Sequence, residues 1–141
     1  MFYTVGGGEI IMRIAKALIY DAKGYALVLR RSSTHPYYAY QPDLPGGIIE
    51  RGEGYEEGLV RELGEEAGIA ITPDQLRLLD TREGLTVSTK RLYEARLDHR
   101  PEVTLSWEHD RYKWVAPNDM QDALESRDSF ISFAQKYLAK Q

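Results

Sequence analysis

The pattern of apolar and polar residues predicts a β-hairpin near the start of the chain. Residues 12–20 and 25–30 form two apolar segments rich in strand-forming residues. The four residues from Asp21 to Gly24 separate them and have the composition of a turn. The expected core positions of this hairpin include Ile14, Leu18, Leu27 and Leu29.

The first eleven residues have no such pattern. They contain the run Gly6 to Gly8, which is weak evidence for a phosphate-binding loop because neither GxGxxG nor a following GK[ST] is present. We interpret residues 1–11 as a flexible lead-in or an edge strand.

A helix is predicted from Glu53 to Ala67, where the chain has no proline. At about 100° per residue, one side of this helix is apolar and the adjoining side is acidic. The apolar side contains Leu59, Val60, Leu63 and Ala67, and the acidic side contains Glu62, Glu65 and Glu66.

The second half of the chain alternates short strands and helices. Strands are predicted at residues 76–81, 85–97, 103–107 and 112–115. A helical turn is expected at 72–75 and a short helix from Pro117. A last helix is capped near Ser126 or Asp128, with an apolar stripe formed by Phe130, Phe133, Ala134, Tyr137 and Leu138. This order predicts an α/β fold with a mixed sheet between helices.

The acidic side of the central helix has two interpretations. Carboxylates that share one helix face repel each other, and a hard cation such as Mg²⁺ would offset that repulsion. An ordinary solvated helix is the alternative, because most glutamate-rich faces are only that. Just ahead of the helix, Gly46 and Gly47 allow close backbone approach, so a main-chain group there could meet a metal or a phosphate.

The loop from Ser32 to Pro42 contains three tyrosines, at positions 37, 38 and 40. Tyr37 and Tyr38 are candidates for stacking on a nucleobase, a contact worth roughly 1 to 3 kcal/mol per base. They could instead pack over the hairpin as a small additional core.

Composition places limits on the class of protein. A chain of 141 residues is expected to form one domain, and no apolar stretch is long enough to cross a bilayer. There are no cysteines and no signal segment, which points to the cytoplasm. The net charge of −4 argues against nonspecific nucleic-acid binding but does not exclude a small nucleotide that enters with its metal. The three scattered histidines do not have the spacing of a zinc site.

The segment from Gly47 to Ile69 resembles the Nudix box of the Nudix (MutT-like) hydrolases. That pattern is Gly, five residues, Glu, seven residues, then Arg-Glu-apolar-x-Glu-Glu-x-Gly-apolar. Every position is met, by Gly47, Glu53, Arg61, Glu62, Leu63, Glu65, Glu66, Gly68 and Ile69. The flanking segments that begin at Asp43 and Glu108 also resemble the family.

The resemblance implies an α/β/α Nudix sandwich and a Mg²⁺-dependent pyrophosphohydrolase, with Mn²⁺ as an alternative ion. Such an enzyme cleaves the diphosphate bridge of a nucleoside diphosphate linked to another moiety. By the same resemblance, the metal ligands are Gly46 through its carbonyl, Glu62, Glu65, Glu66 and Glu108. Glu62 is the candidate general base, Arg61 would orient a glutamate, and Glu53 would support them. Arg30 ends its strand where a Nudix fold brings the sheet near the phosphates, or else it is an exposed charge.

Substrate choice stays open. The residues typical of ADP-ribose, dinucleoside polyphosphate and NADH hydrolases are missing, which favours a nucleoside triphosphate or a modified nucleotide. Alternatives are an RNA 5′-end pyrophosphohydrolase and a Nudix-fold nucleotide-binding domain without catalysis. A monomer and a homodimer are both compatible with the sequence.

Overall fold

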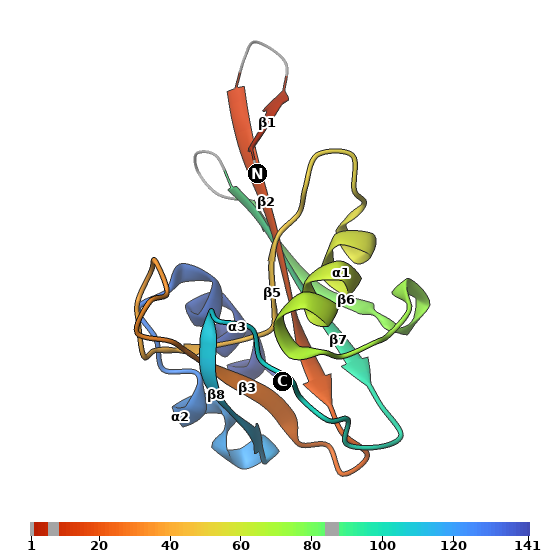
Figure 1. Cartoon of the computed structure of the whole chain (residues 1–141), viewed down its shortest axis with the longest axis vertical. Helices are drawn as coiled ribbons and strands as arrows, with labels where there is room; N and C mark the ends of the chain where they lie inside the picture. The colour runs from red at the N-terminus through yellow and green to blue at the C-terminus, as the bar shows by residue number, and fades with distance from the viewer. Residues whose placement is uncertain (1, 6–8, 84–87) are drawn as a thin grey trace.

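The computed structural model describes residues 2–5, 9–83 and 88–141, and within the first strands it describes side chains from Met12 onward. One mixed sheet dominates these residues (Figure 1). Its strands are β1 (Phe2–Val5), β2 (Glu9–Tyr20), β3 (Ala26–Arg31), β4 (Pro42–Asp43), β5 (Gly46–Ile48), β6 (Arg77–Glu83), β7 (Ser88–Arg96) and β8 (His109–Val115). β2 and β7 are parallel, and the other pairs are antiparallel.

Helices cover both faces of the sheet, which confirms the predicted α/β class (Figure 1). Helix α1 (Tyr55–Ala67) packs on one face, and α2 (Met120–Ala123) with α3 (Ser129–Ala139) packs on the other. Alternate residues of β2 supply the two cores. Ala15, Ala17 and Ile19 join the core under α1, while Leu18 and Tyr20 join the core under α3.

The predicted hairpin is only partly formed. The turn after Tyr20 is present, but β2 and β3 pair at the single position Tyr20↔Ala26. β2 pairs instead with β5 and β7, and β3 pairs with β4 and β8. The strands diverge because the Pro45 carbonyl already accepts the Ala17 N–H at 3.0 Å, so β5 occupies the edge that a longer hairpin would need. This divergence opens the sheet beside Lys16.

Helix α1 begins two residues later than predicted and ends where predicted. Glu53 stays outside the helix because its side chain accepts the Glu50 N–H at 2.8 Å. At the other end Gly68 adopts a left-handed conformation with φ 68°, and the Ile69 N–H donates back to the Leu63 carbonyl. Such a reversal satisfies carbonyls that the last turn leaves unpaired.

The prediction of a strand at residues 103–107 is wrong. In the structure this segment is irregular and runs along the C-terminal end of α1. The Thr104 N–H donates to the Ala67 carbonyl at 2.9 Å, and the Ser106 N–H donates to the Glu66 carbonyl at 3.2 Å. The free carbonyls of the helix end therefore take the donors that a neighbouring strand would have used. This arrangement brings Glu108 close to the helix.

The remaining predicted elements are present apart from shifts at their ends, whereas the short strands β4 and β5 were not predicted. The turns η1 (Pro73–Gln75) and η2 (Pro117–Asp119) are 3₁₀ helices. Asp128 is the N-cap of α3, and its side chain accepts the N–H groups of Phe130 and Ile131. β7 ends at Arg96, and the predicted start of this strand at residue 85 lies outside the described residues. In the described part of the chain, no helix is long and apolar enough to span a bilayer.

Candidate active site

A cleft of about 460 Å³ lies where β2, β5, the end of α1 and the start of α3 meet. Its residues come from seven separate parts of the chain, and they include most of the predicted site. The lining contains Gly46, Gly47, Glu62, Glu66, Glu108, Tyr37 and Tyr38, together with Lys16, Arg31, Asp43, Lys90 and Asp128.

Arg61 organises the carboxylates next to the cleft. Its guanidinium donates to both oxygens of Glu53, at 2.8 and 3.0 Å. It also contacts Glu62 and Glu65, each at 3.1 Å. The hydrogen bond to Glu53 is the main reason that the pKa of Arg61 lies above its ordinary value. A planar, five-donor group can hold several carboxylates at once, and a lysine could not replace it in this role.

Of the predicted ligands on α1, Glu66 is buried and Glu62 is half-buried. Glu66 is 5% exposed, and its Oε2 accepts the Gly46 N–H at 3.1 Å. Burial raises the pKa of both carboxyl groups, and for Glu66 it outweighs the opposite effect of Lys16. Two carboxylates that are costly to ionise in the same cleft provide hard oxygen donors for a cation.

Glu65 lies differently from its two neighbours on the helix. Its side chain is 61% exposed and pairs with Arg61, so it borders the carboxylate cluster without lining the cleft. Glu108 does line the cleft, 3.8 Å from His35 Nε2. Asp110, its neighbour in sequence, turns away to pair with Arg30.

Gly47, the first residue of the box, and Gly46 before it fit the site because they have no side chain. A Cβ on Gly47 would lie 3.1 Å from the Glu62 carboxylate. A Cβ on Gly46 would lie 2.2 Å from the Ala15 carbonyl oxygen, and its φ of 136° is strained for other residues. The chain therefore needs glycine here to place backbone beside Glu62 and Glu66.

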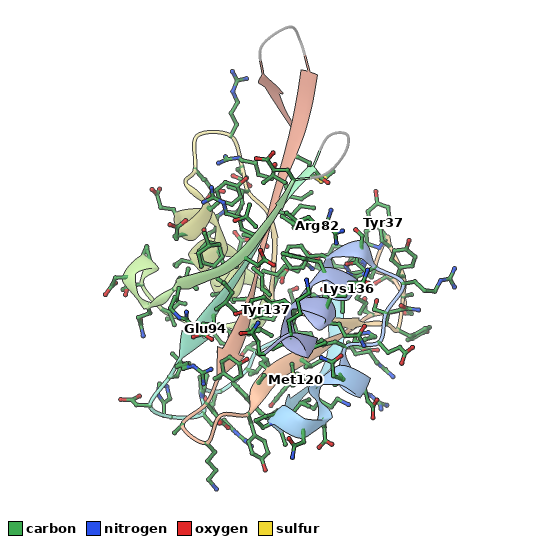
Figure 2. The ribbon with its side chains drawn as sticks, turned by 180° about the vertical axis from the view of Figure 1, so that it is seen from behind. Tyr37, Arg82, Glu94, Met120, Lys136 and Tyr137 are labelled. Atoms are coloured by element: carbon green, nitrogen blue, oxygen red, sulfur yellow. The ribbon has the colours of Figure 1, made fainter. Side chains whose placement is uncertain are left out.

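The predicted substrate-binding residues are not all brought together. Tyr37 and Tyr38 line the cleft, and Figure 2 shows Tyr37 at the periphery of the molecule. Tyr37 is 71% exposed, which places its ring outside both hydrophobic cores. Arg30 lies away from this cleft, in a different pocket, and forms a two-pronged ion pair with Asp110 at 2.8 Å. We therefore leave Arg30 out of the candidate substrate site.

A buried network of charges beneath the cleft was not predicted from the sequence. Asp43 contacts Lys16 at 2.6 Å, His109 at 2.8 Å and Arg31 at 3.2 Å. Arg31 also reaches Asp128, the cap of α3. Burial opposes the charge of Asp43, but these partners outweigh it and hold the pKa of Asp43 well below its usual range. A lysine between two alanines in an apolar strand is the one local signal that could have suggested this network.

Two groups in this region have ligand atoms suited to a metal. One is the set of Gly46, Glu62, Glu66 and Glu108 around the cleft. The other is His35, Asp43 and His109, whose ligand atoms lie within 4.8 Å of one another. In the second group, Asp43 already pairs with the cations Lys16 and Arg31, so a divalent ion there would meet two positive charges. The glutamate set fits a hard cation better.

The cleft thus combines the buried Glu66 and the half-buried Glu62 with glycine backbone, on a mixed sheet between helices, and this arrangement can hold a hard cation beside an anionic substrate. A family model described as the NUDIX domain matches residues 11–134. The chain therefore belongs to the Nudix family, whose members hydrolyse phosphorus-containing anhydrides, as the complete box predicts.

Relatives and solved structures agree with this assignment. An uncharacterized Nudix hydrolase of Nostoc sp. is 27% identical over 90% of this chain and 79% of its own length. The 8-oxo-dGTP diphosphatase of Escherichia coli is 36% identical over 51% of this chain and 54% of its own. The MutT protein from Methanosarcina mazei superposes with a TM-score of 0.74 at 26% identity, covering 92% and 91% of the two chains.

Proposed function

We propose that this protein is a Mg²⁺-dependent pyrophosphohydrolase that cleaves the diphosphate bridge of a nucleoside triphosphate or a modified nucleotide. The observation that carries the proposal is the pair of carboxylates Glu66, which is buried, and Glu62, which is half-buried, in a cleft that also exposes tyrosines. Buried carboxylates with raised pKa values indicate a functional site more strongly than exposed ones do.

The residues of the cleft have distinct roles in this proposal. Glu62, Glu66, Glu108 and the Gly46 carbonyl would hold the ion, and Glu65 would join them by leaving Arg61. The bound ion neutralises the diphosphate and lowers the pKa of water. Glu62 accepts a proton from the attacking water, and Arg61 fixes the carboxylate for that task. Glu53 anchors Arg61 through two hydrogen bonds, so it acts as a positioning residue.

The base of the nucleotide would lie toward the tyrosine loop. Tyr37 and Tyr38 are the aromatic side chains of the cleft with large exposed surfaces. Aromatic rings stack on any base with little sequence preference. The similarity to the 8-oxo-dGTP diphosphatase of Escherichia coli supports a nucleoside triphosphate or its modified form.

A dinucleoside polyphosphate is the second candidate substrate. The asymmetrical bis(5′-nucleosyl)-tetraphosphatase of Caenorhabditis elegans is 28% identical over 84% of this chain and 87% of its own length. That alignment covers 127 residues, whereas the alignment with the diphosphatase covers 72 residues. Both candidates share the same bond type, so the cleft residues would have the same roles.

A hydrolysis panel with Mg²⁺ tests the proposal. It contains common and oxidised nucleoside triphosphates, dinucleoside polyphosphates, ADP-ribose, NADH and 5′-triphosphorylated RNA, with products separated by chromatography. We expect turnover of a triphosphate that needs Mg²⁺ and falls at least about 100-fold in Glu65→Gln, the loss expected for a metal ligand. No turnover of any compound would favour a binding domain, and wild-type rates in Glu65→Gln would remove this residue from the ligand set.

A further inference from the structure

Lys16 is a charged residue in the buried middle of β2. The residues on either side, Ala15 and Ala17, are fully buried. The Lys16 side chain is only 10% exposed, and the surface it retains faces the cleft that it lines. Lysine is almost never buried to this degree without a specific partner.

Asp43 is that partner, and it uses only some of the N–H donors of Lys16. An ammonium group carries three N–H donors. Among the described residues, the Asp43 carboxylate is the hydrogen-bond acceptor within reach of Lys16 Nζ, at 2.6 Å. Donors remain for an acceptor that enters the cleft, and such a buried donor favours an anionic one.

The position of Lys16 in the sheet places this ammonium beside the candidate metal ligands. Lys16 and Gly46 are partners in the pairing of β2 with β5. A Cβ on Gly46 would lie 3.0 Å from Lys16 Cγ, so the lysine stem packs directly on that glycine. The Gly46 N–H in turn holds Glu66. An anionic group that is bound through a cation at the glutamates would therefore lie next to the Lys16 ammonium.

The remaining contacts of Asp43 keep the lysine in place. Arg31 and His109 hold the second oxygen of Asp43, at 3.2 and 2.8 Å. The other oxygen, Oδ1, accepts the Leu44 N–H and orients Lys16. The network thus positions the ammonium before any substrate arrives, which lowers the entropic cost of binding.

We propose that Lys16 binds substrate directly, by donating hydrogen bonds to a non-bridging phosphate oxygen of the diphosphate. This inference rests on the proposed function and adds a binding residue that lies outside the Nudix box. Asp43 is then a positioning residue, which acts through Lys16. A structural ion pair alone would explain the contact with Asp43 but would not explain why the charged end faces a cleft beside two glutamates.

The test is a binding measurement that needs no turnover. The probe is methylenediphosphonate with Mg²⁺, a non-hydrolysable diphosphate, titrated calorimetrically into wild-type protein, Lys16→Met and Lys90→Met. Lys90 is the matched control because it lines the same cleft but lies two residue pairs further along the sheet, where it donates to Ser88. Mn²⁺ titrated without the probe reports whether each variant keeps its metal site, and circular dichroism reports whether it is folded.

We expect Lys16→Met to weaken probe binding about 10- to 100-fold, the range for a lost charge-assisted hydrogen bond, and Lys90→Met to weaken it less than about 3-fold. Mn²⁺ affinity should stay within about 2-fold in both. If Lys16→Met does not fold, Lys16→Gln replaces it, because an amide can still donate to Asp43 and should show the same loss. Unchanged affinity, equal losses in both lysine variants, or no binding by the wild type would overturn the proposal.

The same data separate this inference from the proposed function. Probe binding that depends on Lys16, in a protein that hydrolyses nothing in the panel, would support the phosphate contact and contradict the hydrolase. Hydrolysis in which Lys16→Met has wild-type KM and kcat would support the hydrolase and contradict the contact.

Discussion

The surroundings of Glu66 disfavour the ionised form of its carboxyl group. Burial raises its pKa above the ordinary glutamate value of about 4.3, so the folded state keeps a proton that the unfolded state releases. In the absence of metal, the free energy of unfolding must therefore fall as pH rises from the pKa of the unfolded state toward the higher pKa of the folded state. A cation that binds the ionised form reverses the effect.

We expect Glu66→Gln to melt several degrees above the wild type at pH 8 in the presence of a chelator, because folding of the wild type must then take up a proton and folding of the neutral amide variant need not. The difference should shrink toward pH 4, where the glutamate is protonated in both states. Thermal melts followed by circular dichroism at several pH values measure it. A difference that does not vary with pH would mean that Glu66 does not titrate as its burial implies.

For individual residues, the sequence was informative about contacts between residues that are close in the chain. Glu62 and Glu66 belong to one helix, so their shared face follows from the period of the helix. Lys16, Asp43 and His109 meet across 27 and 66 residues of sequence. No local periodicity encodes such contacts, and the network became visible only once the strands were in place.

Among the elements, the Arg61 side chain of helix α1 binds the loop that precedes the helix. Arg61 links the helix to Glu53 and to the Ile48 carbonyl, at 3.3 Å. Arg61→Lys keeps the charge but loses the planar set of donors. We expect kcat to fall at least about 10-fold and the melting temperature to drop by a few degrees. Unchanged kcat with a lower melting temperature would mean that Arg61 only stabilises the loop.

The tyrosine loop makes a prediction about substrate affinity. Tyr37 is largely exposed, and Tyr38 adopts a left-handed φ of 53° with Arg31 and Arg127 near its ring. Replacing both tyrosines by alanine should raise KM for a nucleotide about 10-fold while kcat changes little, if the rings stack on the base. Steady-state kinetics with the best substrate would show it. Unchanged KM with a lower melting temperature would support a packing role.

The element boundaries show where sequence patterns reach their limit. Helix α1 and the cap of α3 follow from local signals, and both were predicted. The predicted strand at 103–107 failed because the free carbonyls at the end of α1 captured its N–H donors. The hairpin was shortened because β5 occupies the edge of β2. In both cases a contact distant in sequence outweighed a local preference.

Over the whole molecule, the buried charge network joins the β4 segment, β2, β8 and the start of α3 beneath the cleft. Because its partners hold the pKa of Asp43 far below the ordinary value of about 3.9, Asp43 stabilises the fold above that pH. This contribution is lost as pH falls from there toward the pKa of the folded state.

Asp43→Asn should therefore be strongly destabilised at pH 7, by about 3 to 5 kcal/mol, because Lys16 and Arg31 would be left without their shared carboxylate. The gap in unfolding free energy between variant and wild type should narrow below about pH 4. Urea titrations at pH 7 and pH 3 measure both quantities. A gap that stays constant would mean that the ionised Asp43 is not what holds these elements together.

Hydrolysis in the proposed function depends on a cation held by Glu62 and Glu66 of α1. The most direct measurement compares the Mg²⁺-dependent kcat of Glu66→Gln with that of Glu57→Gln on the best substrate of the panel. Both substitutions remove one charge from the same helix, but Glu57 is exposed and does not line the cleft. We predict a loss of at least about 100-fold for Glu66→Gln and less than about 2-fold for Glu57→Gln. Equal rates in the two variants would mean that Glu66 does not hold a cation needed for hydrolysis.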